Sequence, residues 1–585
     1  MREPSQVVPS VPGLRPTPRH RELTVRAVLV AVVVAALMGA AEPTVTLRIG
    51  YGPNLSVVSA FLGFLALGLI GLATRSRASR QEVNLVQTAG TAAGSGVGFM
   101  AVVLAAIDML DQRGLLSIHL TPLQIFAWLA PSGMLGVLLA VPLRKHYIDE
   151  ENLTFADGTA AGETLVLLDQ GPKEAGPRVA ALGAGGAVSA LLTVARQGFG
   201  KIPETLAFTF LSPHAEALRL GTEVGVLSLG AGLLVGMRIT LSMALGMVLA
   251  WVVAPEPLFR AGLVPELSFN LVLQRWIMWP ATGLMLAGGL AALALKWRVI
   301  AKTFRGLGAK DATDGGDFPM RWVLWGSIAC AVVLAIVQKV SLGFPIWLTA
   351  VSVGLSIILM LVGIRVLGET NWAPISAMAN VMQAVFAVLA PGHVPINMIG
   401  SGMSGSVAAN GEHLMQDYRA GKIVGSTNRH LTYLQLLGVP VGAAAVAIAY
   451  PAVRARYGIG GESGLTSPIS VKWAGFAELL AKGFGALPSS AIVALLAAIV
   501  LGVAFTLLEA HPRLGRFVPS PTAIGLGMLI PGFAVFPMVV GGLLQALWKR
   551  VSPRTEDVYN VPLASGFITG EALVLLALAL PAAFR

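Results

Sequence analysis

The sequence has few of the residues that build most soluble enzymes. It contains one cysteine in 585 residues, and only 12% of its residues are charged. A single cysteine, Cys330, allows neither an internal disulfide nor a cluster of thiolate metal ligands. Soluble domains carry about 25% charged residues. The shortage of charge therefore excludes an ordinary soluble domain.

Several short motifs of catalytic sites are absent or out of context. The sequence has no G-x-x-x-x-G-K-[ST] loop, so ATP is not expected to power it, and no H-E-x-x-H zinc motif. Residues 400–405 read GSGMSG and match G-x-G-x-x-G, but the context is apolar and no strand precedes them, as a dinucleotide site would require. We therefore expect no enzyme activity, no catalytic residues, no bound metal and no cofactor.

Long apolar runs take up most of the chain. Hydrophobic residues make up 55% of it, and the mean hydropathy is +0.75. A helix needs about 20 apolar residues to cross a bilayer, and about sixteen such stretches can be counted. This predicts an all-α polytopic membrane protein of about 16 transmembrane helices, with internal pseudosymmetric repeats and broken or re-entrant helices. The region 222–254 is either one tilted helix or two short ones, and 519–549 is a hairpin or a broken helix.

The net charge of +11 lies mainly in short loops beside apolar runs. Basic loops near 75–80 and 144–146 follow the second and fourth runs, as expected for cytoplasmic loops. We predict a cytoplasmic N-terminal tail (1–22), a first transmembrane repeat region (23–310) and a second (311–585), in the plasma (inner) membrane. This charge distribution gives no basic face for nucleic acid. The expected partners are the lipid bilayer and a small-molecule or peptide substrate, and homo-oligomer formation stays open.

One thirteen-residue pattern occurs twice. Residues 155–167 read FADGTAAGETLVL and residues 563–575 read LASGFITGEALVL, with seven identical positions. Each copy carries one carboxylate, Glu163 or Glu571. A carboxylate in the bilayer is costly and usually faces a partner or a water-filled path. Duplicated interrupted segments are typical of a transporter with internal pseudosymmetry.

Four polar segments fall where helices should be apolar: 81–100, 150–165, 397–427 and 564–573. Glycine, serine and threonine let backbone groups line a cavity, and amide, hydroxyl and carboxyl side chains can then bind a zwitterionic or peptide-like solute. The side chains expected to bind substrate are Asn84, Gln87, Thr88, Asp157, Thr159, Asn397, Ser401 and Ser404.

Helix packing explains some of this polarity equally well. The small residues of 90–98 also suit a close helix contact. Asn84 and Gln87 lie on one helix face and can bond a neighbouring helix instead of a solute. Arg238 and Glu223 either form a buried pair or each reach an interface.

The acidic residues also leave alternatives. Glu163 and Glu571 are predicted to bind protons or a substrate amine. Glu412 and His413 either relay protons, because histidine titrates near neutrality, or end a helix in water. Asp157 either caps the helix that follows it or contacts substrate.

Taken together, the polar segments resemble the oligopeptide transporter (OPT) family, which includes the yellow-stripe-like metal–nicotianamine transporters. The similar stretches occur in the family's order and span 81 to 573. They are VNLVQTAGTAAGSG (83–96), ENLTFADGTAAGETL (151–165), MQDYRAGKIVGST (415–427), PTAIGLGMLIPG (521–532) and ASGFITGEAL (564–573).

The resemblance implies a helical importer of about sixteen helices that is coupled to the proton gradient. Its substrates would be small peptides, glutathione-like conjugates or metal chelates. We therefore expect a secondary active transporter of oligopeptides or peptide-derived compounds. The alternatives are a polar-solute channel, which would conduct without saturating, and a transporter of an unrelated small metabolite.

Overall fold

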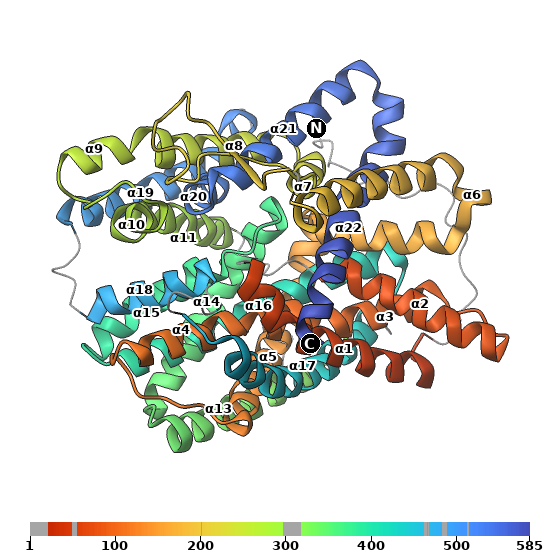
Figure 1. Ribbon diagram of the computed structural model, residues 1–585, viewed down its shortest axis with the longest axis horizontal. Coiled ribbons are helices and arrows are strands. Elements are labelled where there is room, and N and C mark those ends of the chain that lie inside the picture. Colours follow the sequence, from red (N-terminus) through yellow and green to blue (C-terminus); the bar gives the residue numbers. More distant parts are fainter. Residues whose placement is uncertain are drawn as a thin grey trace.

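The computed structural model describes residues 22–49, 55–200, 202–295, 317–460, 465, 467–481, 488–511 and 514–584. Nearly all regular structure in these residues is helical (Figure 1). One antiparallel ribbon joins β1 (Thr205–Ala207) to β2 (Gly221–Glu223), with Thr205 opposite Glu223. The predicted all-α membrane class is confirmed at this level. Almost all of the predicted N-terminal tail lies outside the described residues.

The helices before residue 296 fall into long segments and short, irregular ones. They are α1 (Val25–Ile49), α2 (Ser56–Thr74), α3 (Arg80–Thr91), η1 (Ala92–Val97), η2 (Gly98–Met100), α4 (Ala101–Gln112), α5 (Pro122–Ala140), η3 (Val141–Leu143), η4 (Lys145–Glu150), α6 (Ala156–Thr193), η5 (Val194–Gly198), α7 (Leu227–Val235), α8 (Met237–Met247), η6 (Val248–Val253), α9 (Pro255–Arg260), α10 (Phe269–Val272), η7 (Leu273–Ile277) and α11 (Met278–Leu295).

The helices after residue 316 are mostly long and apolar. They are α13 (Met320–Leu342), α14 (Ile346–Thr370), α15 (Ile375–Leu389), α16 (Val394–Val424), α17 (Asn428–Tyr457), α18 (Pro468–Ala481), α19 (Ser489–Glu509), η10 (Gly515–Phe517), α20 (Pro521–Leu529), α21 (Gly532–Val551) and α22 (Pro553–Phe584).

Twelve helical segments among the described residues are long and apolar enough to cross a membrane. The predicted count of about sixteen is therefore not confirmed. Part of the difference lies in helices that are short, such as the 15-residue α15 and the 9-residue α20. The 31-residue α16 is long enough to span but carries much of the polar segment 397–427.

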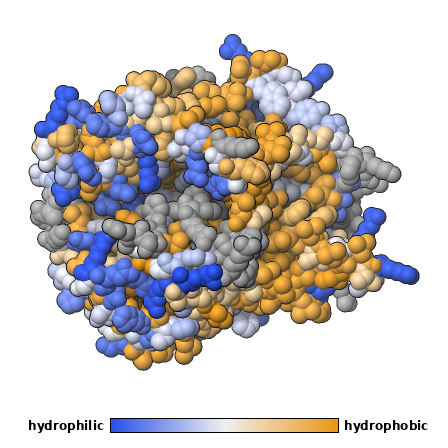
Figure 2. Space-filling model, viewed as in Figure 1, coloured by the Kyte–Doolittle hydropathy of each residue, from blue (hydrophilic) through white to orange (hydrophobic). Residues whose placement is uncertain are grey.

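The first helix shows how the sequence sorts lipid-facing from buried positions. On α1, Val25, Leu29 and Val33 recur every fourth residue and are 78%, 62% and 59% exposed, whereas Ala27 and Ala31 are fully buried. Residues four apart share one helix face, so Val25, Leu29 and Val33 point outward together, and Ala27 and Ala31 point inward. Apolar surface covers much of the side of the molecule where α1 and α2 lie (Figure 2). This exposed face suits lipid rather than water.

Several helices are broken, and residues 222–254 are one example. They form two helices, α7 and α8, which are separated by Gly236 with a φ of 90° and are followed by the π-helical η6. The segment 519–549 forms α20 and α21, which meet at Ile530 and Pro531. In α6, Gly176 has a φ of +37°. The ribbon of α6 turns back on itself partway along its length (Figure 1).

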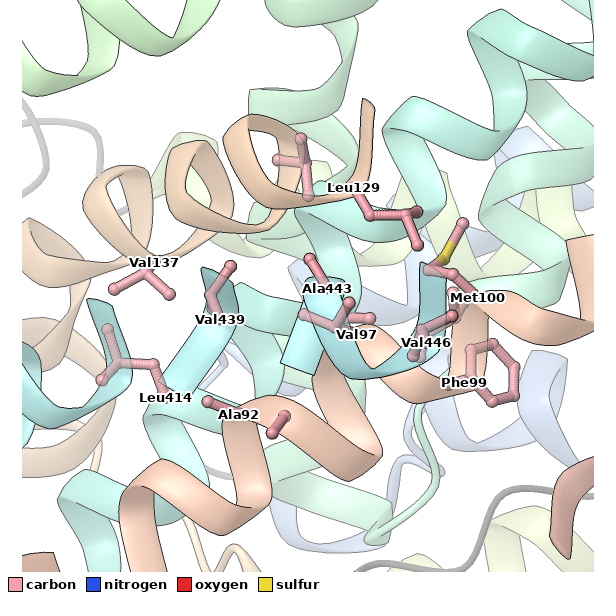
Figure 3. Packing of buried hydrophobic residues seen from close by; sticks show 14 of the residues in the cluster. Ala92, Val97, Phe99, Met100, Leu129, Val137, Leu414, Val439, Ala443 and Val446 are labelled. Carbon is pink, nitrogen blue, oxygen red and sulfur yellow. The ribbon is translucent and has the colours of Figure 1, made fainter. Parts of the chain in front are cut away.

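The buried apolar side chains form two large clusters. The first joins α1, α3, α4, α5, α16 and α17, and the second joins α8, α11, α14, α15, α20 and α21. Within the first, Val97 of η1 packs against Ala443 and Val446 of α17 (Figure 3). Small residues allow the approach: a Cβ built on Gly442 would lie 2.5 Å from Cα of Ala93.

The predicted division into two repeat regions near residue 310 stays a prediction. The boundary itself falls in 296–316, outside the described residues. Both apolar clusters draw residues from both sides of it.

Candidate functional site

A cavity of about 560 Å³ lies at the boundary between the two apolar clusters. Its lining includes Phe99 and Ile375 from the first cluster and Phe269 and Leu526 from the second. Small-molecule sites are usually concave spaces of about 300–1,000 Å³ that combine apolar walls with a few polar groups. This cavity matches that description in size and composition.

Broken helices supply much of the cavity wall. Ser95 and Phe99 come from the π-helical and 3₁₀ segments between α3 and α4, and Ile530 comes from the gap between α20 and α21. Irregular backbone at membrane depth is tolerated where it lines a cavity or is buried in protein, and π-helical turns are frequent at functional sites.

Strained backbone also gathers here. Asn371 and Arg219, which line the cavity, have φ angles of 62° and 54°, and Phe155, two residues before the lining Asp157, has a φ of 42°. A non-glycine residue in the left-handed region costs on the order of 1–3 kcal/mol and persists where its surroundings hold it. The clustering of such residues at one cavity makes this cavity the candidate functional site.

Charged groups of both signs line the cavity. They are the carboxylates Asp157, Glu204, Glu223 and Glu571, the cations Arg219 and Lys472, and His413. Aromatic side chains add flat apolar walls, namely Phe99, Phe269, Trp372 and Phe533.

Glu571 is held by an ion pair. Nη2 of Arg196 lies 2.6 Å from its Oε1, and the backbone N–H of Leu227 donates to its Oε2 at 3.1 Å. Arg196 also donates to the carbonyl of Val224 at 2.9 Å. Both side chains of the pair are almost fully buried, so each charge depends on the other. The pair joins η5, α22 and the start of α7 at the cavity edge.

Asp157 and Asn371 bond each other in both directions. The N–H of Asp157 donates to Oδ1 of Asn371 at 3.0 Å, and Nδ2 of Asn371 donates to the Asp157 carboxylate at 2.8 Å. Gln416 accepts the N–H of Gly158 at 2.7 Å. Phe155 is the N-cap residue of α6, and Asp157 lies in its first turn. The cap interpretation of Asp157 is therefore wrong, because the Asn371 side chain caps the N–H of Asp157 instead.

Arg219 and Lys472 are the cations of the cavity wall. The guanidinium of Arg219 lies 5.0 Å from the ring centre of Phe269, and burial lowers the pKa of Arg219. Burial also lowers the pKa of Lys472, on α18, to about 8. Neither forms an ion pair with any residue in the described ranges. Both can therefore bind a carboxylate from a solute.

Three of the predicted site residues line this cavity: Asp157, His413 and Glu571. The predicted residues of α3 do not line it. Asn84 donates to Ser426 at 2.9 Å, Gln87 donates to Asp417, and Thr88 donates to the carbonyl of Asn84 at 2.9 Å. Their amides and hydroxyls serve contacts within and between helices in this conformation.

The predicted residues of α16 and one of α6 are placed similarly. Asn397 donates to the carbonyl of Gln383, Ser401 and Ser404 donate to carbonyls one turn earlier in α16, and Thr159 donates to the carbonyl of Thr154. They do not line the cavity. A role for them in substrate binding stays a prediction.

The other predicted proton sites are buried. Glu163 does not line the cavity, and it interacts electrostatically with Arg178 and Arg419. Glu412 is fully buried in the middle of α16, and its two carboxyl oxygens have no hydrogen-bond partner among the described residues. The alternative of a solvated helix end is therefore wrong. His413, beside it, is 8% exposed and reaches the cavity.

Sequence reasoning missed several residues of the site. They are Arg196, Arg219, Asn371, Gln416 and Lys472. The open question about Arg238 is also answered, because Arg238 pairs with Glu509 at 2.8 Å. Glu223 faces the cavity instead.

Comparison with known proteins now identifies the family. The family model of the OPT oligopeptide transporter proteins matches residues 22–582. The chain belongs to the oligopeptide transporter family. The resemblance seen in the polar segments is thereby confirmed over nearly the whole chain.

Proteins with similar sequences come from yeast and plants. A Saccharomyces cerevisiae protein whose given name is that of an oligopeptide transporter is 23% identical over 725 residues, 97% of each chain. Two Oryza sativa subsp. japonica proteins named "probable metal-nicotianamine transporter" are 23% and 24% identical, covering 95% and 97% of this chain and 85% and 95% of their own. These relatives are named as transporters and not as enzymes.

Proposed function

We propose that this protein is a secondary active transporter that imports oligopeptides or peptide-derived compounds, including metal chelates, together with protons. The single observation that carries the proposal is the cavity of about 560 Å³ with carboxylates and the cations Arg219 and Lys472 on its wall. The names of the relatives, which refer to oligopeptides and to metal–nicotianamine chelates, support the substrate class.

The charges suit a compound with both carboxylate and ammonium groups. Arg219 and Lys472 would bind carboxylates, and Asp157 and Glu204 would bind an ammonium group or a proton donor. Charge-assisted hydrogen bonds of this kind are stronger than neutral ones. Phe269 and Trp372 offer apolar surface to side chains, which suits peptides of varied sequence.

The position of the cavity suggests the moving parts. Transporters expose a central site to one side at a time when one group of helices moves against another. The two apolar clusters meet at the cavity, so we infer that they are the two groups. Glu571 and His413 would take part in proton coupling from the cavity wall, and Glu163 and Glu412 from the helices behind it.

We place the protein in the plasma (inner) membrane with its N-terminus in the cytoplasm, on the distribution of basic loops. The bilayer is its permanent surrounding, and the α1 face with Val25, Leu29 and Val33 is one surface that contacts lipid.

Transport assays in proteoliposomes test the proposal. A thermal-shift screen of di- to pentapeptides, glutathione and metal–nicotianamine chelates would first select a compound, because a bound ligand raises the melting temperature. An inward pH gradient should then accumulate it, and preloaded unlabelled compound should accelerate entry of the labelled form. Flux that neither saturates nor shows this exchange would favour the channel.

A further inference from the structure

The β1–β2 ribbon places one carboxylate beside the Arg196–Glu571 ion pair. Glu223 ends β2 and lines the cavity. Two residues later, Gly225 packs directly on the ion pair: a Cβ built there would lie 2.6 Å from Nη1 of Arg196 and 3.1 Å from either carboxylate oxygen of Glu571. Glu223 therefore lies close to a second carboxylate, Glu571, and to the guanidinium of Arg196.

The guanidinium of Arg196 already forms an ion pair with Glu571. Arg196 donates hydrogen bonds to Glu571 and to the carbonyl of Val224. Glu223 is held by the side chain of Ser228, which is buried on α7. Two carboxylates that share one cation cannot both be fully compensated, and one of them takes a proton more easily.

Burial raises the pKa of Glu223 to about 7, and the neighbouring charge of Glu571 acts in the same direction. The hydrogen bond from Ser228 and the charge of Arg196 lower it. Glu223 lies outside the twelve apolar spans. A carboxyl group that titrates near neutrality can bind and release a proton over the pH range of a membrane gradient.

Other charged groups face Glu223 from the surrounding elements. They are Arg196 from η5, Glu571 from α22, Glu204 and Arg219 from the ribbon and its connection, and Asp157, His413 and Lys472 across the cavity. The helices α7 and α21, which pack against this region, carry no titratable residue between 227 and 235 or between 532 and 545.

We propose that Glu223 carries the coupling proton, and that its protonation prepares the cavity for a substrate that bears carboxylates. The inference rests on the proposed function and assigns one step of it. The described lining of the cavity carries four carboxylates: Asp157, Glu204, Glu223 and Glu571. The nearby cations are three, Arg219, Lys472 and Arg196, so when every carboxylate is ionised and His413 is neutral the negative charges exceed the positive ones by one. A proton on Glu223 removes this excess and lowers the repulsion of an incoming anion at Arg219 and Lys472.

Coupling follows from linkage between the two ligands. If protonation of Glu223 raises the affinity for a carboxylate-bearing solute, the bound solute raises the affinity of Glu223 for the proton by the same factor. Both would bind from the side of lower pH. On the other side Glu223 would lose its proton to water, and the restored negative charge would expel the solute. No bond other than that to the proton forms or breaks.

The variant Glu223→Gln tests the assignment, with Glu216→Gln as the matched control. Glu216 lies in the connection between the same two strands but is exposed and does not line the cavity. The probes are glutathione and a zinc–nicotianamine chelate, both rich in carboxylates. In the wild type and in Glu216→Gln, binding above pH 7 should weaken up to about tenfold for each pH unit, as expected for one linked proton.

Glu223→Gln should lose the weakening of probe binding that begins near pH 7 and keep only the smaller decline toward pH 8 that comes from Lys472, whose pKa is about 8. It should lose accumulation under a pH gradient but keep exchange of labelled against unlabelled probe. The variant Ser228→Ala should keep the pH dependence and move its midpoint upward, because it loses a hydrogen bond to the ionised form. This second variant tests the site without removing the carboxylate.

A measurement without a substrate separates the two proposals. Infrared difference spectra of the wild type should show a protonated-carboxyl band that titrates near pH 7, is absent from Glu223→Gln and is retained in Glu216→Gln. Wild-type accumulation by Glu223→Gln, or retention of the band in it, would overturn the inference and leave the transporter standing. Absence of carrier exchange in the wild type would overturn the proposed function even if the band were found.

Discussion

The two copies of the repeated motif differ in their neighbours although they agree in sequence. In both, the paired glycines bring the helix against another helix. A Cβ on Gly158 would lie 2.3 Å from the carbonyl oxygen of Gln416 in α16, and one on Gly566 would lie 2.3 Å from that of Leu182 in α6. The second glycines, Gly162 and Gly570, also lie close to the facing helix: a Cβ on Gly162 would lie 2.9 Å from Cβ of Ile423 in α16, and one on Gly570 would lie 2.3 Å from the carbonyl oxygen of Gly186 in α6.

The acids that follow these glycines do not share one environment. Glu571 reaches the cavity and pairs with Arg196, whereas Glu163 stays behind the cavity wall among the charges of Arg178 and Arg419. The shared residues thus account for helix docking in both copies. The function of each carboxylate is set by the elements that face it, which the motif does not contain.

The largest expected effect comes from replacing the carboxylate of each copy, Glu163 or Glu571, with glutamine. Glu571→Gln leaves Arg196 buried without its counter-charge, and breaking one side of a buried pair costs about 3–5 kcal/mol. Glu163→Gln removes no ion pair recorded among the described residues and should cost about 1 kcal/mol. The melting temperature, measured on both variants, should show a much greater loss for Glu571→Gln.

A double variant identifies the cause of that loss. Adding Arg196→Gln to Glu571→Gln removes the stranded cation as well, so the two changes should be less harmful together than their separate effects predict. Strict additivity would show that the 2.6 Å contact between Arg196 and Glu571 contributes little. Equal losses of stability in Glu163→Gln and Glu571→Gln would show that the two carboxylates do not differ in the way described above.

The next effect tests what the copies share. Gly158→Ala and Gly566→Ala each force a Cβ against a backbone oxygen, and overpacking of this kind costs about 1–3 kcal/mol. We expect similar falls in melting temperature for both. Gly183→Ala is the matched control, because a Cβ there meets nothing within 4 Å and alanine favours a helix. A fall at only one of the two sites would show that the copies dock differently.

Much of the architecture could be predicted from the sequence, and part of the site. Apolar runs indicated the membrane class, and glycine and proline marked helix breaks such as those at Gly236 and Pro531. Three predicted site residues line the cavity. They could be singled out because carboxylates and histidine are rare in apolar helices, and such rare residues can be recognised in a sequence.

The rest of the site depends on contacts between distant parts of the chain. Arg196 lies 375 positions from Glu571 in the sequence, and no local sequence pattern predicts that they form an ion pair. Asn84 and Gln87 illustrate the opposite error. A polar side chain in a membrane needs a hydrogen-bond partner whether that partner is a solute or a helix, so the sequence could not separate these helix contacts from a binding site.

The smallest expected effect concerns Gly225, which packs against the ion pair of Glu571, the acid of the second copy. Gly225 covers the Arg196–Glu571 pair, and in Gly225→Ala the new methyl group would lie 2.6 Å from Nη1 of Arg196. Because that atom ends a flexible side chain, it can move aside, and we expect a stability loss of about 1 kcal/mol or less. The shift of Arg196 away from Glu571 should nevertheless change transport more than it changes melting temperature. Uptake rates that fall only in proportion to stability would contradict this, and would mean that the ion pair holds α22 in place without taking part in coupling.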